Sequence, residues 1–384
     1  MEKILVGLSG GVDSAVAAYL LKEQGYDVTC AFMRNWDSIA NSDLLGNPTL
    51  DDGQCSQEKD WDDARLAAEK LGLPLLRIDF IEEYWTDVFS RFLESYRRGR
   101  TPNPDILCNR YIKFDQFMKF AREKGFDTLA TGHYAKIGER DGKKVLMKAD
   151  DRNKDQSYFL AEISRSTLNH ILFPLSSINK TQVREIAKKL DLSIAGKKDS
   201  TGICFIGERR FRQFLSNYLP MTPGKIIHIS GREVGMHQGV LYYTIGQRKG
   251  LNIGGTGPYF VIGKDIEKNE LYVTDEEEES WLYSTSCLVR NVNWLADTNL
   301  PKEMAAKFRY RQNDQKITLK QIDETTALAL FPETVRSVTP GQEAVFYDDD
   351  AVIGGGEIDQ VFQGGKDLQV LIHETIEERR SDGI

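Results

Sequence analysis

The stretch "ILVGLSGGVDSAVAAYLLKEQG" near the N-terminus constrains the fold more than any other part of the chain. Four residues that favour a strand run directly into Ser9–Ser14, and a helical pattern follows at once. A strand, a glycine-rich turn and a helix form a phosphate-binding design, because backbone N–H groups point outward at the helix start and the helix dipole favours an anion there. The sequence therefore predicts an α/β fold with an anion site at this turn.

The side chains of the turn refine this prediction. Gly10 and Gly11 allow the backbone to approach a ligand closely, and the hydroxyls of Ser9 and Ser14 add hydrogen-bond donors. Asp13 is acidic, which suits either a Mg²⁺ ligand or a favourable charge at the start of a helix. The turn lacks the lysine of a Walker A loop and the spacing of GxGxxG, so neither of those nucleotide motifs applies.

Strands and helices alternate over the first two hundred residues, and a glycine follows each of the predicted helices. This alternation predicts a doubly wound parallel sheet. A hairpin around Asp141-Gly142 and a capping box at Asn179–Gln182 are also expected. The strand candidates are Lys3–Leu8, Asp27–Met33, Pro74–Asp79 and Thr128–Thr131, and the helix candidates are Ala15–Gln24, Asp60–Leu71 and Lys113–Lys124.

After about residue 210 the helical patterns disappear, and short β-rich segments lie between glycine-containing turns. We therefore expect three domains: an α/β catalytic domain over 1–210, a small central β-rich domain over 211–280, and a C-terminal, barrel-like β domain over 281–384. No internal repeat is found in the sequence.

Composition narrows the class of protein. The net charge of −8 argues against indiscriminate nucleic-acid binding, although local clusters such as Arg97–Arg100 could hold a phosphate backbone. The five cysteines are widely spaced without a CxxC pair, so we expect neither a disulfide scaffold nor a metal site. No apolar run approaches the ~20 residues of a membrane helix, and no signal peptide precedes the first strand. We therefore expect a cytoplasmic protein that does not contact membranes.

Two of the cysteines lie in settings that could support chemistry. Cys108 follows Asp105 by three residues in "TPNPDILCNRYIKF", which places both side chains on one helical face. The carboxylate could exchange a proton but would by itself raise the thiol pKa, so Arg110, Lys113 or Arg97–Arg100 would have to offset it. On this stretch alone a structural role for Cys108 is the favoured interpretation.

Cys204 lies in "GKKDSTGICFIGERRF" between glycine-containing turns and basic residues. Four nearby cations predict a lowered thiol pKa, which raises the reactive thiolate fraction. An inert, buried cysteine remains the alternative from this segment alone. These cations are Lys197, Lys198, Arg209 and Arg210.

Taken together in this order, SGGVDS, NPDILCN and DSTGICFIGERRF resemble the motifs of the tRNA-specific 2-thiouridylases, within the N-type ATP pyrophosphatase superfamily. The similarity extends over essentially the whole chain and includes "RNWD" at Arg34, "TGHYA" at Thr131, "KDQSYFL" at Lys154, "YTIGQRKGL" at Tyr243 and "RYRQ" at Arg309. The resemblance implies an adenine nucleotide alpha hydrolase-like fold with a pyrophosphatase-type (PP-) loop.

The resemblance also implies an activity. Enzymes of this family use ATP, with Mg²⁺, to adenylate O2 of the wobble uridine in the anticodons of tRNAs for Lys, Glu and Gln, and then place sulfur on C2. The sulfur comes as a persulfide from a cysteine desulfurase, directly or through relay proteins. Cys204 would carry that persulfide, Cys108 would be its partner nucleophile and could end disulfide-linked to Cys204, and Asp105 would be the acid–base group. We also expect the two thiols to line one cleft, around a mobile Cys204 segment.

The remaining site residues follow from motif matches to the family. ATP would contact Gly7, Leu8, Ser9, Gly10, Gly11, Val12, Asp13, Ser14, Met33 and Gly132. The target base would contact Asn103, Pro104 and Asp105. Other parts of the tRNA would contact His133, Lys154, Asp155, Gln156, Arg309, Tyr310 and Gln342. No role is assigned to Cys30, Cys55 or Cys287.

Two alternatives stay open at this point. Another PP-loop ligase or amidotransferase could adenylate a small molecule, and it would need no reactive cysteine pair. A non-catalytic RNA-binding module could use the β domains alone. The sulfur donor, the set of tRNAs and the oligomeric state are not fixed by the sequence.

Overall fold

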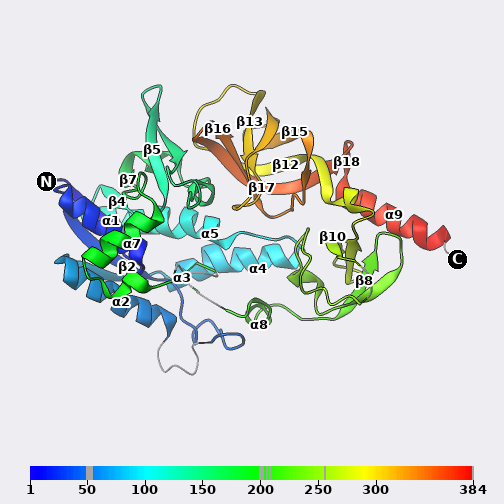
Figure 1. Cartoon of the computed structure of the whole chain (residues 1–384), viewed down its shortest axis with the longest axis horizontal. Coiled ribbons are helices and arrows are strands. Elements are labelled where there is room, and N and C mark those ends of the chain that lie inside the picture. Colours follow the sequence, from blue (N-terminus) through cyan, green and yellow to red (C-terminus); the bar gives the residue numbers. More distant parts are fainter. Residues whose placement is uncertain (49–54, 199–202, 205, 207–208, 255–256, 383–384) are drawn as a thin grey trace.

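The computed structural model describes residues 1–384 except 49–54, 199–202, 205, 207–208, 255–256 and 383–384 (Figure 1). Three sheets organise the described residues: a five-stranded parallel sheet, a four-stranded sheet and a nine-stranded sheet that contains a closed barrel. In Figure 1 the small sheet and the C-terminal helix lie at the opposite end of the molecule from the parallel sheet.

The parallel sheet has the order β3-β2-β1-β4-β7, which confirms the predicted doubly wound fold. β1 is central, and the chain adds β2 and β3 on one side before it crosses to β4 and β7 on the other. Such a reversal leaves a crevice at the carboxyl ends of the strands, where open α/β sheets bind ligands. The strands are β1 (Lys3–Gly7), β2 (Asp27–Arg34), β3 (Leu75–Asp79), β4 (Thr128–Ala130) and β7 (Ile171–Leu172).

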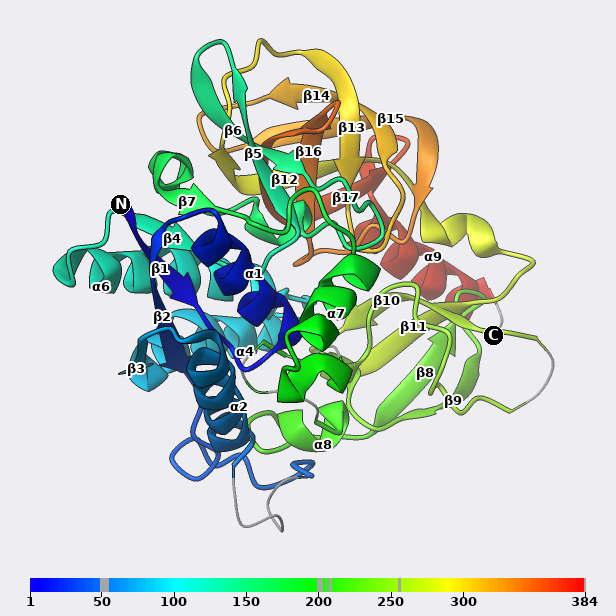
Figure 2. The same ribbon diagram turned by 60° about the vertical axis from the view of Figure 1, so that its left-hand side comes forward.

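Helices cover both faces of this sheet because successive residues of a strand point to opposite sides. Ile4 and Val6 pack in the core with α1 (Val12–Glu23), α2 (Ser56–Leu71) and α7 (Lys180–Lys189), which Figure 2 shows together on one side of the sheet. Leu5 packs in the opposite core. That core contains the helical run α3 (Ile81–Tyr84), η2 (Trp85–Phe89) and α4 (Ser90–Arg97), and the run α5 (Pro104–Leu107), η3 (Cys108–Gln116) and α6 (Phe117–Glu123).

The second of these runs begins well before the predicted start at Lys113. Pro104 is its first residue, and the side chain of Asn103 caps it by accepting a hydrogen bond from the Asp105 N–H at 3.1 Å. Proline suits the first helical position because its fixed φ is helical and no N–H is needed there. Pro104 therefore marks a helix start that places Asp105 and Cys108 on a helix.

The hairpin predicted around Asp141-Gly142 is present as β5 (Ala135–Arg140) and β6 (Lys143–Lys148), and the capping box of Asn179 and Gln182 at the start of α7 is confirmed. The hairpin joins the C-terminal sheet, because β6 pairs with β17 through Met147 and Ala351. Short 3₁₀ segments follow at η4 (Ser157–Leu160), η5 (Arg165–His170) and η6 (Ser193–Gly196).

The central sheet has the order β10-β11-β8-β9 and follows the short helix α8 (Phe211–Leu215). Its strands are β8 (Gly224–His228), β9 (Glu233–His237), β10 (Phe260–Asp265) and β11 (Glu270–Thr274), with a 3₁₀ segment, η7 (Val240–Tyr242), between β9 and β10.

The barrel closes because β12 pairs with both β15 and β17. The order around it is β12-β15-β14-β13-β16-β17, and the closed barrel confirms the barrel-like C-terminal domain expected from the sequence. Its elements are η8 (Glu279–Leu282), β12 (Tyr283–Trp294), β13 (Lys302–Lys307), β14 (Gln315–Gln321), β15 (Ala327–Arg336), β16 (Glu343–Asp348), β17 (Ala351–Gln363) and the short β18 (Lys366–Asp367).

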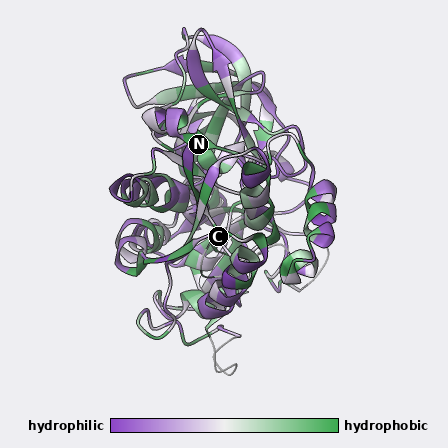
Figure 3. Ribbon diagram, turned by 90° about the vertical axis from the view of Figure 1, so that its left-hand side faces the viewer, coloured by the Kyte–Doolittle hydropathy of each residue, from purple (hydrophilic) through white to green (hydrophobic). Residues whose placement is uncertain are grey.

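The expectation that helices disappear after residue 210 is wrong at the C-terminus, where α9 spans Leu368–Asp382. Leu368, Ile372 and Ile376 are buried at a spacing of four, so the apolar side of α9 is a single narrow stripe in a largely charged segment. Gln369 donates to the carbonyl of Ile262 in β10 at 2.9 Å, so α9 connects the barrel to the central sheet. In Figure 3 hydrophobic residues (green) and hydrophilic residues (purple) alternate along the helices. Among the described residues, no helix is both long and apolar enough to cross a membrane.

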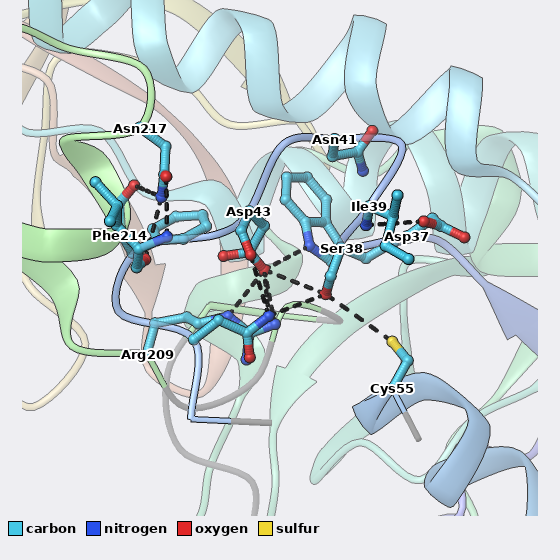
Figure 4. Close-up of polar contacts among 12 residues, drawn as sticks. Asp37, Ser38, Ile39, Asn41, Asp43, Cys55, Arg209, Phe214 and Asn217 are labelled. Atoms are coloured by element: carbon cyan, nitrogen blue, oxygen red, sulfur yellow. Dashed lines mark hydrogen bonds and ion pairs between the residues drawn. The ribbon is translucent and has the colours of Figure 1, made fainter. Parts of the chain in front are cut away.

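A buried ion pair joins the loop after β2 to the segment that follows Cys204. The Asp43 carboxylate accepts hydrogen bonds from Arg209 Nε at 2.9 Å and Nη2 at 2.8 Å, and from Trp36 Nε1 at 3.0 Å (Figure 4). The side chains of Asp43 and Arg209 are 0% and 3% exposed. This contact fixes a position five residues after Cys204 against the loop that follows β2.

We predict that Asp43→Ala lowers the free energy of unfolding by about 3–5 kcal/mol, because it leaves the buried guanidinium of Arg209 without its partner. Urea denaturation followed by tryptophan fluorescence measures this loss. The control is Lys70→Met, which breaks an exposed ion pair between Lys70 and Asp191, and which we expect to change stability by less than about 1 kcal/mol. Equal effects of the two substitutions would contradict the assignment.

Candidate functional site

A cavity of about 340 Å³ lies at the carboxyl ends of β1, β2 and β4, at the reversal of strand order. The turn after β1, the start of α2, the helix that begins at Pro104 and the loop after β4 all contribute to its wall. Its lining includes Gly7, Leu8, Ser9, Asp13, Ser14, Met33, Ser56, Gln57, Asp105, Asn109, Lys113, Gly132, His133, Gln156, Phe159 and Cys204. Residues from the predicted nucleotide, base and sulfur sites therefore meet in one cavity.

In the glycine-rich turn the backbone packs closely against neighbouring backbone, at positions where only glycine fits. Gly10 has a φ of 75°, and a Cβ there would overlap the backbone oxygen of Asp60. A Cβ on Gly132 would lie 2.7 Å from the backbone nitrogen of Ser14. Gly11 is the N-cap of α1 and no side chain caps this helix end, so N–H groups of its first turn remain for an anion. These features fit a bound phosphate.

The hydroxyls of the turn brace it. Ser14 Oγ donates to the carbonyl of Gly11 at 3.0 Å and accepts from the N–H of Ser9 at 3.1 Å. The hydroxyl of Ser9 lies 3.2 Å from that of Ser14, and Ser9 is exposed. Ser14 thus holds the turn, whereas Ser9 remains open to a ligand.

Asp13 is already paired in this structure. Its carboxylate accepts hydrogen bonds from Lys180 Nζ at 2.7 and 2.8 Å, and from the hydroxyl of Tyr134 at 2.8 Å. Lys180 is the first residue of α7, so a second helix start lies beside the turn. A metal ion could bind Asp13 only by displacing the Lys180 ammonium.

The two thiols predicted to act together lie side by side. The Sγ atoms of Cys108 and Cys204 are 3.7 Å apart, although the residues are 96 positions apart in sequence. The Cys204 N–H donates to Asp105 Oδ1 at 3.1 Å, and its carbonyl accepts from the hydroxyl of Tyr84 at 2.7 Å. Cys204 lines the cavity and Cys108 lies behind it, fully buried. Residues 199–202, 205 and 207–208 around Cys204 lie outside the described residues, so the expected mobility of this segment is untested.

The surroundings shift the pKa values of the two thiols in opposite directions. The hydrogen bond from the Cys108 thiol lowers the pKa of Cys204, and the positive charge of Lys113 lowers it further against the effect of burial. Burial raises the pKa of Cys108 well above its ordinary value. Cys204 is therefore the thiol that ionises first, and Cys108 is its proton-bearing neighbour.

Two of the four cations expected to lower the Cys204 pKa have carboxylate partners of their own. Lys197 binds the carboxylates of Asp60 at 2.8 Å and Asp63 at 2.7 Å, and Arg209 binds Asp43. Arg110, one of the candidates near Cys108, binds Glu162 at 3.0 Å. Lys113 alone among the named candidates acts on both thiols, because it lies on the same helix as Cys108 and faces Cys204 across the cavity.

The carboxyl group of Asp105 has a raised pKa, chiefly because it is buried, and Lys113 and the Cys204 N–H partly oppose this. A raised pKa makes this carboxylate a better proton acceptor than an exposed aspartate. Its position beside both thiols keeps the predicted acid–base role available.

His133 and Gln156 line the same cavity. The pKa of His133 is lowered well below its usual range by burial and then by Lys113, so its ring is neutral. Its Nδ1 lies 2.8 Å from the hydroxyl of Thr131. Gln156 accepts from the N–H of Tyr134 at 3.0 Å. Both residues, predicted to contact tRNA, therefore lie within reach of a base in the cavity.

The other predicted RNA contacts lie outside the cavity. Asn103 lines a larger hollow, of about 760 Å³, between α4, α5 and the barrel. Gln342 donates to the carbonyl of Thr101 at 2.6 Å, so it connects the barrel to the chain just before Asn103. Arg309 donates to the carbonyls of Ile245 and Ser337 and is largely buried, so its guanidinium has a structural role here.

Three further residues complete the placement of the predicted site. The ring of Tyr310 lies 4.4 Å from that of Phe159, which lines the cavity. Asp155 is buried and accepts from Ala149 and Ser157, and the neighbouring Lys154 is half-buried. Gly10, Gly11, Val12, Pro104 and Cys108 support the cavity from behind and do not line it.

Several lining residues were not predicted, among them Asn109, Phe159, Ser56 and Gln57. Asn109 carried a detectable signal, because Asp105, Asn109 and Lys113 recur every four residues and so share one side of a helix. Ser56 and Gln57 gave no such signal, since only the fold brings the start of α2 to this place. The described residues contain no cluster of three or more histidine, cysteine, aspartate or glutamate side chains that could hold a metal ion.

Comparison with known proteins identifies the chain. Residues 2–208 match the family model "tRNA methyl transferase HUP domain", residues 212–275 match "tRNA methyl transferase PRC-barrel domain", and residues 284–358 match "Aminomethyltransferase beta-barrel domain". Among solved structures, a 4-thiouridine synthetase–RNA complex with bound ATP covers 56% of this chain and 50% of its own at a TM-score of 0.32 and 18% identity, which is too weak a likeness to support an argument.

Curated relatives match almost the entire chain. The tRNA-specific 2-thiouridylase MnmA of Mycoplasma mycoides is 51% identical over 373 residues, which cover 94% of this chain and 100% of that protein. The proteins of the same name from Acholeplasma laidlawii and Bacillus cereus are 49% and 47% identical and cover 95% and 96% of this chain, and 98% of each relative. The chain belongs to the tRNA-specific 2-thiouridylase family.

Proposed function

We propose that this protein is an ATP-dependent tRNA-uridine 2-sulfurtransferase that replaces O2 of the wobble uridine by sulfur, in the anticodons of tRNAs for Lys, Glu and Gln. The observation that carries the proposal is the pair of thiols 3.7 Å apart beside a cavity that also contains the glycine-rich turn. Family membership supports the substrate class.

ATP would lie on the turn after β1. The N–H groups at the start of α1 and the hydroxyl of Ser9 would bind its phosphates, with Met33 and Gly132 beside the nucleotide. When bound, ATP would supply the adenylyl group that turns uracil O2 into a leaving group, and pyrophosphate and later AMP would be released. Mg²⁺ would accompany the nucleotide, and Asp13 would have to exchange Lys180 for the metal.

The cysteines would carry the sulfur. Cys204 would hold it as a persulfide received from a cysteine desulfurase or a relay protein, and the terminal sulfur would attack C2 of the activated base. Cys108 would then attack the inner sulfur of Cys204, which forms a disulfide and releases the thiolated base. Closing the thiols from 3.7 Å to the ~2.05 Å of a disulfide requires only a local movement. An external thiol would reduce the disulfide for the next cycle.

Asp105 would exchange protons beside the thiols, and the neutral ring of His133 and the amide of Gln156 would contact the base or its neighbours. A base in an anticodon loop is single-stranded, so moving it into the cavity requires little unpairing. Lys154, Asp155, Arg309, Tyr310 and Gln342 would contact or position the rest of the tRNA, and Asn103 and Pro104 would lie beside the target base.

We also propose that 1–210 act as the catalytic domain, 211–280 as a spacer domain and 281–384 as the tRNA-contacting domain, in a cytoplasmic enzyme. The β5–β6 hairpin belongs to the first segment in sequence and to the barrel sheet in space.

We predict that Cys204→Ser and Cys108→Ser each abolish formation of 2-thiouridine, because each removes a sulfur that the transfer requires. Mass spectrometry of the nucleosides from tRNA incubated with enzyme, ATP and a persulfide donor measures the product. Cys55→Ser is the control: Cys55 is half-buried and does not line the cavity. Full thiolation by Cys204→Ser would contradict the role of Cys204 as the sulfur carrier. Adenylation of a small molecule that survives Cys204→Ser, with no thiolation by the unaltered enzyme, would favour the alternative ligase. Absence of tRNA-dependent pyrophosphate release by the unaltered enzyme would exclude adenylation.

The pH dependence of Cys204 reactivity gives a second prediction. Alkylation by iodoacetamide accelerates as pH rises through the thiol pKa, and for Cys204 this midpoint should lie below the ordinary thiol value. Lys113→Met removes a charge that favours the thiolate, so the midpoint should move upward. Peptide mass spectrometry of Cys204 measures the rates. Lys119→Met, an exposed lysine of α6 paired with Asp115, should leave the midpoint unchanged; an equal shift would contradict the role of Lys113.

The turn itself gives a third prediction. Gly10→Ala should weaken ATP binding about tenfold or more. A side chain at this positive φ costs about 1–3 kcal/mol, so the free variant relaxes away from this conformation and must return to it to bind ATP. A cost of about 1.4 kcal/mol lowers the affinity tenfold. The new Cβ would also overlap the backbone of Asp60. Isothermal titration calorimetry measures the affinity. Gly196→Ala, where an added Cβ meets no atom within 4 Å, should bind ATP normally. Unchanged affinity in Gly10→Ala would place the nucleotide elsewhere.

A further inference from the structure

Asn109, one of the residues that line the cavity, carries an unused hydrogen-bond acceptor. Its side chain lines the cavity and the residue is only 2% exposed. Its Oδ1 atom has no hydrogen-bond partner among the described residues and is shielded from solvent. A buried acceptor without a donor destabilises a protein, and such groups are kept where a function requires them.

The orientation of this amide is fixed by its neighbour. Asn109 Nδ2 lies 2.9 Å from the backbone oxygen of Phe159, and a carbonyl oxygen can only accept. The nitrogen must therefore face Phe159, and the oxygen is the atom left for a ligand. The ligand group that satisfies it must be a donor.

The position of Asn109 indicates which donor this is. Asp105 and Lys113 lie four residues before and after it on the same side of the helix, and both contact Cys204. Asn109 is also the residue directly after Cys108. A base whose C2 atom is placed for attack by sulfur from Cys204 brings its N3 atom, which is bonded to C2, to this part of the wall.

We propose that Asn109 reads the target base by accepting a hydrogen bond from N3–H of uracil and thereby rejects cytosine; this inference rests on the proposed function. Uracil presents a donor at N3, whereas cytosine presents a lone pair there. Cytosine would leave two acceptors facing each other without a hydrogen, and a site built to pair one polar group discriminates strongly against an analogue that cannot pair with it.

The test measures binding of synthetic anticodon stem-loop RNAs that carry uridine, cytidine or N3-methyluridine at the wobble position. We expect the unaltered enzyme to prefer uridine over cytidine by about 100-fold, and Asn109→Ala to reduce this preference to less than about 10-fold. N3-methyluridine should bind the unaltered enzyme poorly. It should bind Asn109→Ala at least as well as uridine does, because the methyl group occupies the space left by the amide.

Asn35→Ala is the matched control. Asn35 is also a buried asparagine, 0% exposed, whose Oδ1 lacks a partner among the described residues, but it does not line the cavity. It should leave the uridine-to-cytidine ratio unchanged, and thermal unfolding of both variants separates loss of fold from loss of discrimination. The ratio is informative because a purely structural defect weakens all three RNAs equally.

The outcomes are distinguishable. If Asn109→Ala keeps the uridine-to-cytidine preference of the unaltered enzyme, the assignment of Asn109 to N3–H is wrong. If it also weakens ATP binding, an amino group of the nucleotide is the better partner. If the unaltered enzyme forms no 2-thiouridine in any of these RNAs that it binds, the proposed function fails first.

Discussion

The hydrogen bond between Asp105 and the backbone of Cys204 is the contact on which the site depends. It attaches the segment of the second cysteine to the helix of the first, and the hydroxyl of Tyr84 secures the other side of the same residue. Because both bonds go to backbone atoms of Cys204, its side chain stays free to approach Cys108 and the cavity. The carboxylate of Asp105 thus positions the segment that carries the second sulfur.

Few charged side chains act on the two thiols and on the glycine-rich turn. The chain is acidic overall, with a net charge of −8, and Arg110, Lys197 and Arg209 near the site are committed to carboxylates. This leaves Lys113 to act on the thiols, and buried charges act strongly because the local dielectric is low. In the same way, the ammonium of Lys180 is the charge that pairs with Asp13 in the glycine-rich turn.

Much of the site could be predicted because its chemistry lies in contiguous stretches. The strand, turn and helix around Ser9–Ser14, and the helical stripe that starts at Asp105, both encode their geometry locally. The partners of charged groups could not be predicted in this way. Arg209 binds Asp43 across 166 positions of sequence, and such a pairing is decided by the tertiary fold. The helix α9 was missed because its apolar stripe is narrow and its other residues are largely charged.

The strand pairing between β6 and β17 has a mechanical consequence. The β5–β6 hairpin begins at Ala135, two residues after His133 in the cavity wall, and its far strand is part of the barrel sheet. The chain that shapes the pocket is thus continuous with a strand hydrogen-bonded to the barrel. Any tilt of the barrel against the parallel sheet must either break this pairing or pull on the pocket wall, so the hairpin acts as a tether that transmits force on the C-terminal region to the cavity.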